Sequence, residues 1–302
     1  MAPFKHKLSG RYLRLNNITF DNQSDFSNYS DLYYGEYHLQ YFRKWLTTTL
    51  GMVSSYTLSQ SVLFQGEHTT TNNALFLQLD AKAWEILNFS AGLRYEAFRL
   101  DSRFFEKPVF RSGISAALTT TTYARASYGQ AFRFPSIAES FTATRVGAIS
   151  VYANPNLKPE TGRSYELGIK QLFSFQKIKG YADLAVFQMQ YFNMMEYNAS
   201  FWGEFRPPLF GFGFLPLNIG ETRIRGVELA TALEGKLPWF NYRLLAGYTY
   251  ALPQILNPDE AFATDTTGQV QSYPQYQHRP QQQHPEIPLP TFSETGCPAE
   301  VQ

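Results

Sequence analysis

The sequence has little that would indicate a helical membrane protein, a disulfide-linked domain or a nucleic-acid-binding protein. No stretch approaches 18 consecutive apolar residues, which excludes a transmembrane helix. The single cysteine, Cys297, excludes an intramolecular disulfide and a cysteine metal site. The 26 basic and 25 acidic residues leave a net charge of +1, so a polyanionic partner is not expected. Residues 1–12 also lack the apolar core of a secretory signal.

No arrangement of side chains predicts catalysis. Ser, His and Asp are present, but none lies in a nucleophile-elbow context, no paired carboxylates stand out, and no glycine-rich phosphate loop is visible. The histidines are scattered, and only His278 and His284 lie close together, where we interpret them as solvated. We therefore expect a protein that is not an enzyme and that uses no metal and no cofactor.

Aromatic residues, at 17%, and a period-two pattern are what the sequence has in abundance. In residues 89–97 the odd positions carry Phe, Ala, Leu, Tyr and Ala, whereas the even positions carry Ser, Gly, Arg and Glu. The same alternation recurs in residues 75–83, 164–170 and 242–250. Such two-sided segments are typical of β-strands with one apolar and one polar face.

The pattern predicts about eleven strands, and most of them reach the roughly 9 to 11 residues that cross a bilayer. They are expected near residues 10–20, 33–44, 50–65, 73–84, 88–100, 108–119, 122–132, 162–174, 180–194, 221–234 and 240–251. Soluble sandwiches usually have strands of about 5 to 6 residues. Strand length therefore favours a membrane-spanning sheet.

The expected connections alternate between short and long. Short turns are expected at residues 85–87, 119–122, 175–179 and 235–239, and long loops at 21–32, 133–161 and 195–220. Short turns on one rim and long loops on the other are typical of outer-membrane barrels. The predicted fold class is all-β, an antiparallel up-and-down transmembrane β-barrel, present here as a partial barrel or curled open sheet.

The composition changes after Leu256. Residues 257–302 are rich in Pro, Gln and His and show no alternating strand. A segment of this composition cannot bury enough apolar area to fold, so we expect it to be disordered, extended or aberrant. The expected domains are a partial barrel over residues 1–256 and this tail.

Three motifs follow one another in a fixed order. The first is a strand end at residues 128–135, Tyr-Gly-Gln-Ala-Phe-Arg-Phe-Pro; the second is the loop Asn-Pro-Asn-Leu-Lys-Pro-Glu at 154–160; and the third is the strand Ile-Arg-Gly-Val-Glu at 224–228. As an ordered set they resemble TonB-dependent outer-membrane receptors. The resemblance covers roughly residues 70–251, and more loosely the chain back to about residue 10.

The resemblance implies a 22-stranded barrel closed by a plug that takes up a scarce ligand across the outer membrane of a Gram-negative cell. Its implied partners are the lipid bilayer, a small-molecule or oligosaccharide ligand, and a TonB-type energising complex reached through an N-terminal part that this chain lacks. The ligand would be a siderophore-bound iron, a cobalamin or an oligosaccharide. The strand count is about half that of the family and the C-terminus is atypical, so we expect a C-terminal barrel portion and consider a truncation or frameshift.

Two groups of candidate residues follow from this interpretation. The aromatic residues of the expected outer loops are candidates for ligand contact, namely Tyr152, Tyr197, Trp202 and Phe205. The motif residues are expected to be structural, namely Phe132, Arg133, Pro135, Asn154, Pro155, Leu157, Lys158, Pro159, Glu160, Gly226 and Glu228. Two other functions stay open: a passive outer-membrane pore or surface-binding barrel, and a soluble all-β carbohydrate-binding module.

Overall fold

The computed structural model describes residues 3–18, 27–203, 211–258, 261–264 and 270–272. The chain divides into two units, Met1–Asn257 and Pro258–Gln302. Among the described residues, no helix is long and apolar enough to cross a membrane.

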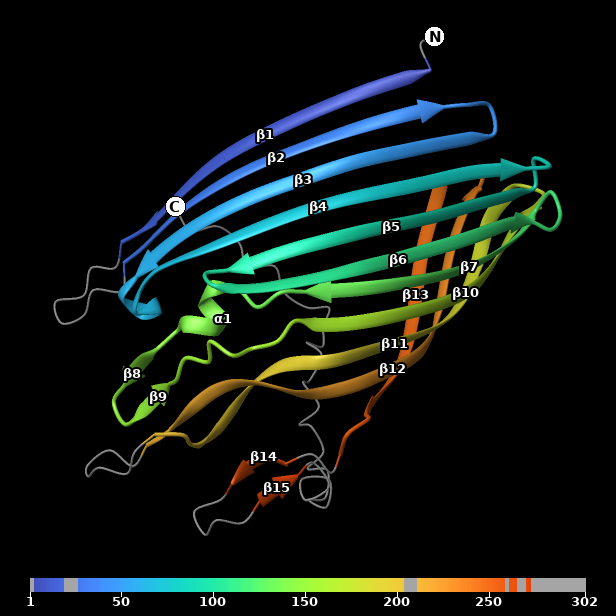
Figure 1. Cartoon of the computed structure of the whole chain (residues 1–302). Helices are drawn as coiled ribbons and strands as arrows, with labels where there is room; N and C mark the ends of the chain where they lie inside the picture. Colours follow the sequence, from blue (N-terminus) through green and yellow to red (C-terminus); the bar gives the residue numbers. More distant parts are fainter. Residues whose placement is uncertain (1–2, 19–26, 204–210, 259–260, 265–269, 273–302) are drawn as a thin grey trace, which may run out of the picture. The chain divides into compact units, whose positions relative to one another are not determined.

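The first unit contains one sheet of 13 strands (Figure 1). Its eleven long strands are β1 (Phe4–Asn17), β2 (Asn28–Phe42), β3 (Leu46–Ser61), β4 (Gly66–Ala83), β5 (Leu87–Leu100), β6 (Arg103–Ala117), β7 (Thr122–Arg133), β10 (Glu160–Phe175), β11 (Ile178–Phe201), β12 (Phe212–Lys236) and β13 (Asn241–Ile255). Its short elements are the 3-10 turn η1 (Val62–Phe64), the helix α1 (Ile137–Phe141), β8 (Thr144–Val146) and β9 (Ile149–Val151).

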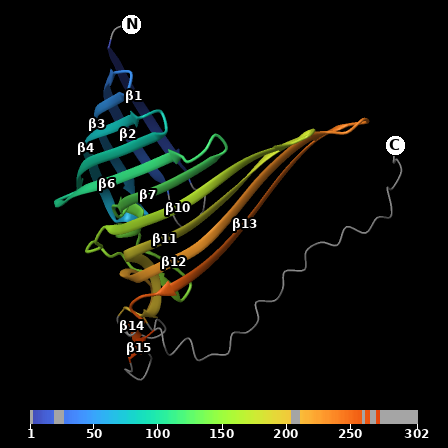
Figure 2. The same cartoon turned by 90° about the vertical axis from the view of Figure 1, so that its right-hand side faces the viewer.

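The long strands pair antiparallel in chain order, as Figures 1 and 2 show. The short strand β9 adds to the far end of β12 in parallel, with Gly213 opposite Ser150. Within the described residues, β1 and β13 each pair on one side only, so the sheet is open. The predicted fold class, an all-β antiparallel sheet that forms part of a barrel, is confirmed.

The connections between the long strands differ in length between the two ends of the sheet. At the end that we call the short-turn rim, at the right of Figure 1, the connections are two to four residues long: 43–45, 84–86, 118–121, 176–177 and 237–240. The opposite end, the long-loop rim, carries the connections 18–27, 62–65, 101–102, 134–159 and 202–211.

The two faces of the sheet differ in the side chains that they carry. On β5, Phe89, Leu93 and Tyr95 point to one side and are 40%, 53% and 43% exposed, whereas Arg94 and Glu96 point to the other. We call the side of Leu93 the apolar face and the side of Arg94 the polar face. Among the described residues no second sheet or helical layer covers the apolar face, and many large apolar side chains are exposed on it.

The hairpin of β11 and β12 is longer than the sequence predicts. A loop was expected over residues 195–220, but β11 continues to Phe201 and β12 begins at Phe212. The register shifts between Tyr191 and Met195, and Asn193 adopts a left-handed φ of 55°. A bulge of this kind changes which face successive side chains occupy, so it interrupts the alternation from which the strand end was read.

The second unit contains two short strands, β14 (Ala261–Thr264) and β15 (Val270–Ser272), which pair antiparallel. They differ from the expectation that no strand follows residue 256. Most of the tail from residue 257 to 302 lies outside the described residues.

Candidate functional site

The long connection between β7 and β10 begins with a helix that its own sequence caps. Ser136 is the N-cap of α1, and its hydroxyl accepts a hydrogen bond from the Glu139 backbone N–H at 3.1 Å. The Glu139 carboxylate in turn accepts from the Ser136 backbone N–H at 2.8 Å, which completes a capping box. The preceding Pro135 is fully buried. The chain is therefore turned into a helix directly after β7 ends.

Apolar side chains hold this helix against the polar face at the long-loop rim. Phe98 and Leu100 of β5 lie on the same side of that strand as Arg94, and Ile137 of α1 packs against them. The Phe98 ring stacks on Phe134 with centroids 4.0 Å apart. Because close-packed side chains leave little room for displacement, this cluster holds α1 in place at the rim.

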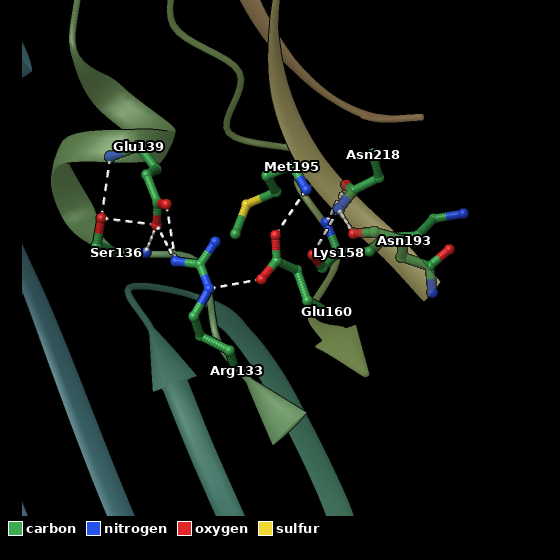
Figure 3. Close-up of polar contacts among 8 residues, drawn as sticks. All are labelled: Arg133, Ser136, Glu139, Lys158, Glu160, Asn193, Met195 and Asn218. Carbon is green, nitrogen blue, oxygen red and sulfur yellow. Dashed lines mark hydrogen bonds and ion pairs between the residues drawn. The ribbon is translucent and has the colours of Figure 1, made fainter. Parts of the chain in front are cut away.

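Arg133, the last residue of β7, joins the helix to the next strand (Figure 3). Its guanidinium donates to Glu139 Oε1 at 2.7 Å and to Glu160 Oε2 at 2.6 Å. The side chain of Arg133 is 49% exposed, whereas those of Glu139 and Glu160 are 25% and 20% exposed. One cation thus bridges two partly buried carboxylates from the two ends of the same loop.

The charge state of Glu139 is stabilised by its neighbours. Burial disfavours its carboxylate form, but hydrogen bonds from the Ser136 backbone, the Arg133 guanidinium and the Ser136 hydroxyl outweigh this effect. The pKa of Glu139 is therefore lower than its ordinary value.

The segment 154–160 is attached to the extended part of the β11–β12 hairpin. The Asn154 amide donates to Pro216 O at 2.8 Å. Asn218 accepts from the Lys158 N–H at 2.7 Å and donates back to Lys158 O at 2.9 Å (Figure 3). Glu160 accepts from the Met195 N–H at 2.7 Å, at the bulge.

The remaining residues of this segment pack or support it. Leu157 is fully buried, Pro159 is half-buried, and Pro155 O accepts a hydrogen bond from Arg103 at the start of β6. The segment therefore contacts four strands besides its own, namely β6, β7, β11 and β12.

Three other motif residues lie apart from this network. The Phe132 ring meets Phe134 edge-on with centroids 4.3 Å apart. Gly226 lies directly opposite Phe187, and its missing side chain leaves room for that ring. Glu228 is exposed on the polar face.

The three candidate ligand-contact residues that the structure describes lie at the same rim but not in one cluster. The Tyr152 hydroxyl donates to Gly211 O at 3.1 Å, and the Trp202 indole N–H donates to Asn198 O at 2.9 Å. Tyr197 belongs to β11 rather than to a loop and is 52% exposed. Phe205 lies outside the described residues.

The sequence analysis did not single out Ser136, Glu139 or Asn218. Ser136 and Glu139 could have been found from the sequence, because Ser followed three residues later by Glu is the capping-box spacing and predicts the start of a helix. No local sequence pattern predicts the role of Asn218, since its partner Lys158 is 60 residues away.

A family model described as "TonB dependent receptor-like, beta-barrel" matches residues 4–283. The chain belongs to this family. The resemblance that the three motifs indicated is confirmed, and all three lie within the matched range.

Known relatives are longer than this chain. The chain is 27% identical over 134 residues to the vitamin B12 transporter BtuB of Vibrio vulnificus, a match that covers 44% of the chain and 19% of the relative. The solved siderophore receptor PirA of Pseudomonas aeruginosa is similar in fold, with a TM-score of 0.67 and 15% identity over 84% of this chain and 55% of that one.

The Serratia marcescens hemophore receptor HasR, solved with its hemophore HasA and heme, has a TM-score of 0.65 and 18% identity over 82% of this chain and 45% of HasR. The chain thus spans about half the length of these solved receptors. At these identities the structures show the shared fold alone.

Proposed function

We propose that the chain forms about half of the barrel of an outer-membrane receptor that takes up a scarce ligand. The observation that carries this proposal is the uncovered apolar face on eleven long strands. Water is a poor solvent for so much exposed apolar surface, whereas the hydrocarbon of a bilayer is a suitable one. A soluble carbohydrate-binding module would need a second layer over that face.

The side chains of the short-turn rim indicate how the sheet would be oriented in the membrane. Trp45, Trp84 and Trp239 lie in its turns and are 60%, 81% and 91% exposed. Tryptophan is enriched at membrane interfaces, where its ring meets the apolar interior and its N–H meets water. This rim would then lie at the inner headgroups, and the long-loop rim would face the outside of the cell.

We assign two roles at the long-loop rim. The network of Arg133, Glu139 and Glu160 would fix the loop that follows β7, and Gly226 would allow close packing on the polar face. Tyr152, Tyr197 and Trp202, together with Phe205, would form part of the surface that the ligand meets. The relatives' names suggest cobalamin, heme or a siderophore as ligand classes to test, and an oligosaccharide remains a candidate.

Energy coupling and barrel closure would need parts that the eleven strands do not supply. Two sheet edges in hydrocarbon leave unpaired backbone groups that cost several kcal/mol each. We therefore infer that residues 1–302 alone stay an open sheet, and that uptake belongs to the whole receptor together with a TonB-type complex.

Uptake in whole cells tests the proposal. The whole protein that carries this chain is expressed in a Gram-negative host that lacks its own receptors, and uptake of labelled cobalamin, heme and ferric siderophores is measured with and without the host's TonB. Uptake of one ligand that depends on TonB is expected. Uptake that is unchanged without TonB would favour a passive pore, and a protein absent from the outer-membrane fraction would refute the assignment.

A further inference from the structure

A row of polar side chains crosses five strands on the apolar face. The register places Arg163 of β10 between Gln130 of β7 and Gln190 of β11, and it places Arg223 of β12 between Gln190 and Gln254 of β13. Because strand positions two residues apart share a face, these residues lie on the same side as Leu167 and Val227. A fully polar row is unexpected on a face meant for hydrocarbon.

The next row, two residues nearer the short-turn rim, is partly polar. It carries Tyr128, Tyr165, Gln188, Arg225 and Leu252 on the same five strands. The row beyond it carries only apolar side chains and one tyrosine, namely Ala126, Leu167, Val186, Val227 and Tyr250. We call Arg163, Arg223 and Arg225 the arginine patch.

The arginine patch has no acidic partner among the described residues. Arg225 donates to Gln188 Oε1 at 2.8 Å, and the Arg163 guanidinium lies 5.8 Å from the centre of the Phe192 ring. Arg223 Nε is shielded from solvent and forms no hydrogen bond to any described residue. By contrast, Arg14 at the other side of the same face is paired with Asp31 at 2.7 Å.

The patch lies at a defined height above the short-turn rim. Arg225 stands eleven residues before Lys236, and Arg163 stands twelve residues before Phe175. At about 3.3 Å per residue and a tilt of about 45°, this separation is roughly 25 Å, which matches the apolar band of a membrane barrel. The patch therefore coincides with the outer headgroup level in the orientation proposed above.

A hollow on the apolar face adjoins the patch. It has a volume of about 1020 Å³, and its lining includes Arg225 and Gln188 together with Leu167, Val186 and Val227. One end of the lining is thus cationic and the rest is mainly apolar, which suits a molecule with an anionic head and hydrocarbon chains.

We propose that the arginine patch binds the phosphate groups of a phosphorylated glycolipid in the outer leaflet, with the acyl chains of that lipid along the hollow. A phosphate monoester carries more than one negative charge and three acceptor oxygens, and guanidinium groups bind such oxygens in pairs. The glutamines and tyrosines of the two polar rows supply neutral donors for sugar hydroxyls. This inference rests on the proposed outer-membrane location.

Retention of lipid by the whole receptor tests the inference. Wild-type protein and the variant R163Q/R223Q/R225Q are reconstituted into phosphatidylcholine vesicles that contain bis-phosphorylated lipid A, re-extracted in neutral detergent, and analysed by mass spectrometry. The wild type is expected to retain at least about tenfold more lipid A, because three charge-assisted contacts are lost in the variant. The control R11Q/R43Q/R111Q removes the same number of charges from exposed positions on the polar face and in a short turn, and it is expected to retain lipid A like the wild type.

Three results would overturn the inference. They are equal retention by the arginine-patch variant, equal retention of dephosphorylated lipid A, and equal retention of phosphatidylglycerol, which would indicate a general attraction for anionic lipid. Protease protection and heat-dependent gel mobility report insertion separately. A wild-type protein that fails to insert refutes the proposed function and this inference with it, whereas an inserted protein that retains no lipid A refutes this inference alone.

Discussion

Arg125 and Arg133, on the polar side of the sheet, and the arginine patch on the apolar face have opposite surroundings. On the polar face, Arg125 donates to Glu166 at 2.8 Å and to Asp183 at 2.6 Å. At the long-loop rim, Arg133 bridges two carboxylates in the same way. On the apolar face, the arginine patch has no carboxylate within ion-pair distance among the described residues.

This comparison distinguishes arginines that hold parts of the chain together from arginines that are free to bind an anionic ligand. A guanidinium already bound to two carboxylates has its strongest interactions satisfied, and removing it leaves those carboxylates uncompensated. An arginine without an anionic partner has no ion pair to lose within the protein. Substitution of Arg125 or Arg133 should therefore weaken folding, whereas substitution of the arginine patch should weaken ligand retention.

The largest effect on folding is expected from filling the space at Gly226. A Cβ there would lie within 2.5 Å of the backbone oxygen of Tyr250 and would also clash with the Phe187 ring. We expect Gly226→Val to lower the free energy of unfolding by about 3 kcal/mol, at the upper end of the usual cost of overpacking, since neither strand can move away freely. Urea unfolding in detergent measures this effect.

Gly247 provides a control position for the steric clash of an added Cβ. A Cβ at Gly247 has its nearest neighbour, Leu229 O, at 3.9 Å. Gly247→Ala should therefore leave the unfolding midpoint almost unchanged. If Gly226→Val were tolerated equally well, close packing of the polar face would not be a source of stability.

Removing the bridge at Arg133 should have the next largest effect. Arg133→Met leaves Glu139 and Glu160 partly buried without their cation. The cost is about 1–3 kcal/mol, below that of a fully buried pair, because half of the Arg133 side chain is exposed and screened by water. Faster cleavage of residues 134–159 by a protease would show that the loop, not the whole sheet, is released. Unchanged cleavage would contradict the bridging role, and exposed Arg99 serves as the control position.

Acid should release the same loop with a smaller effect. The folded-state pKa of Glu139 is below its ordinary value, so its contribution to stability is present above about pH 4.3 and is lost as the pH falls through the folded-state pKa. Protection of the α1 amides from hydrogen exchange, measured relative to the intrinsic exchange rate at each pH, should therefore decrease below that pH. Glu139→Gln should reduce this protection at neutral pH and weaken the acid dependence, of which the part due to Glu160, whose pKa is also lowered, remains. Glu228→Gln, at an exposed position, should keep the full acid dependence.

The strands were predicted well where the alternation of apolar and polar residues is regular, and poorly where it is interrupted. The strand expected at 88–100 is observed as Leu87–Leu100, because its alternation is regular and local. The expected loop over residues 195–220 is wrong because the bulge after Tyr191 shifts the alternation.

The contacts of the candidate site depend on long-range register. The hydrogen bonds between Lys158 and Asn218 join residues 60 positions apart, and no local sequence pattern predicts them. Likewise, Arg225 shares a face with Val227, which the sequence shows, but the alignment of Arg163 and Arg223 in one row requires the pairing of β10, β11 and β12. Local periodicity therefore predicted the elements, and the structure was needed to find which side chains meet.

The smallest effect on folding is expected from the arginine patch itself. In neutral detergent, R163Q/R223Q/R225Q should unfold at the wild-type urea midpoint, because Arg163 and Arg225 are exposed and none of the three has an acidic partner among the described residues. In vesicles that contain bis-phosphorylated lipid A, the wild type alone should gain stability, since a ligand that binds only the folded state shifts the unfolding equilibrium. A lower midpoint for the variant in neutral detergent would mean that the arginines stabilise the sheet directly, and the distinction between the paired arginines and the arginine patch would then fail.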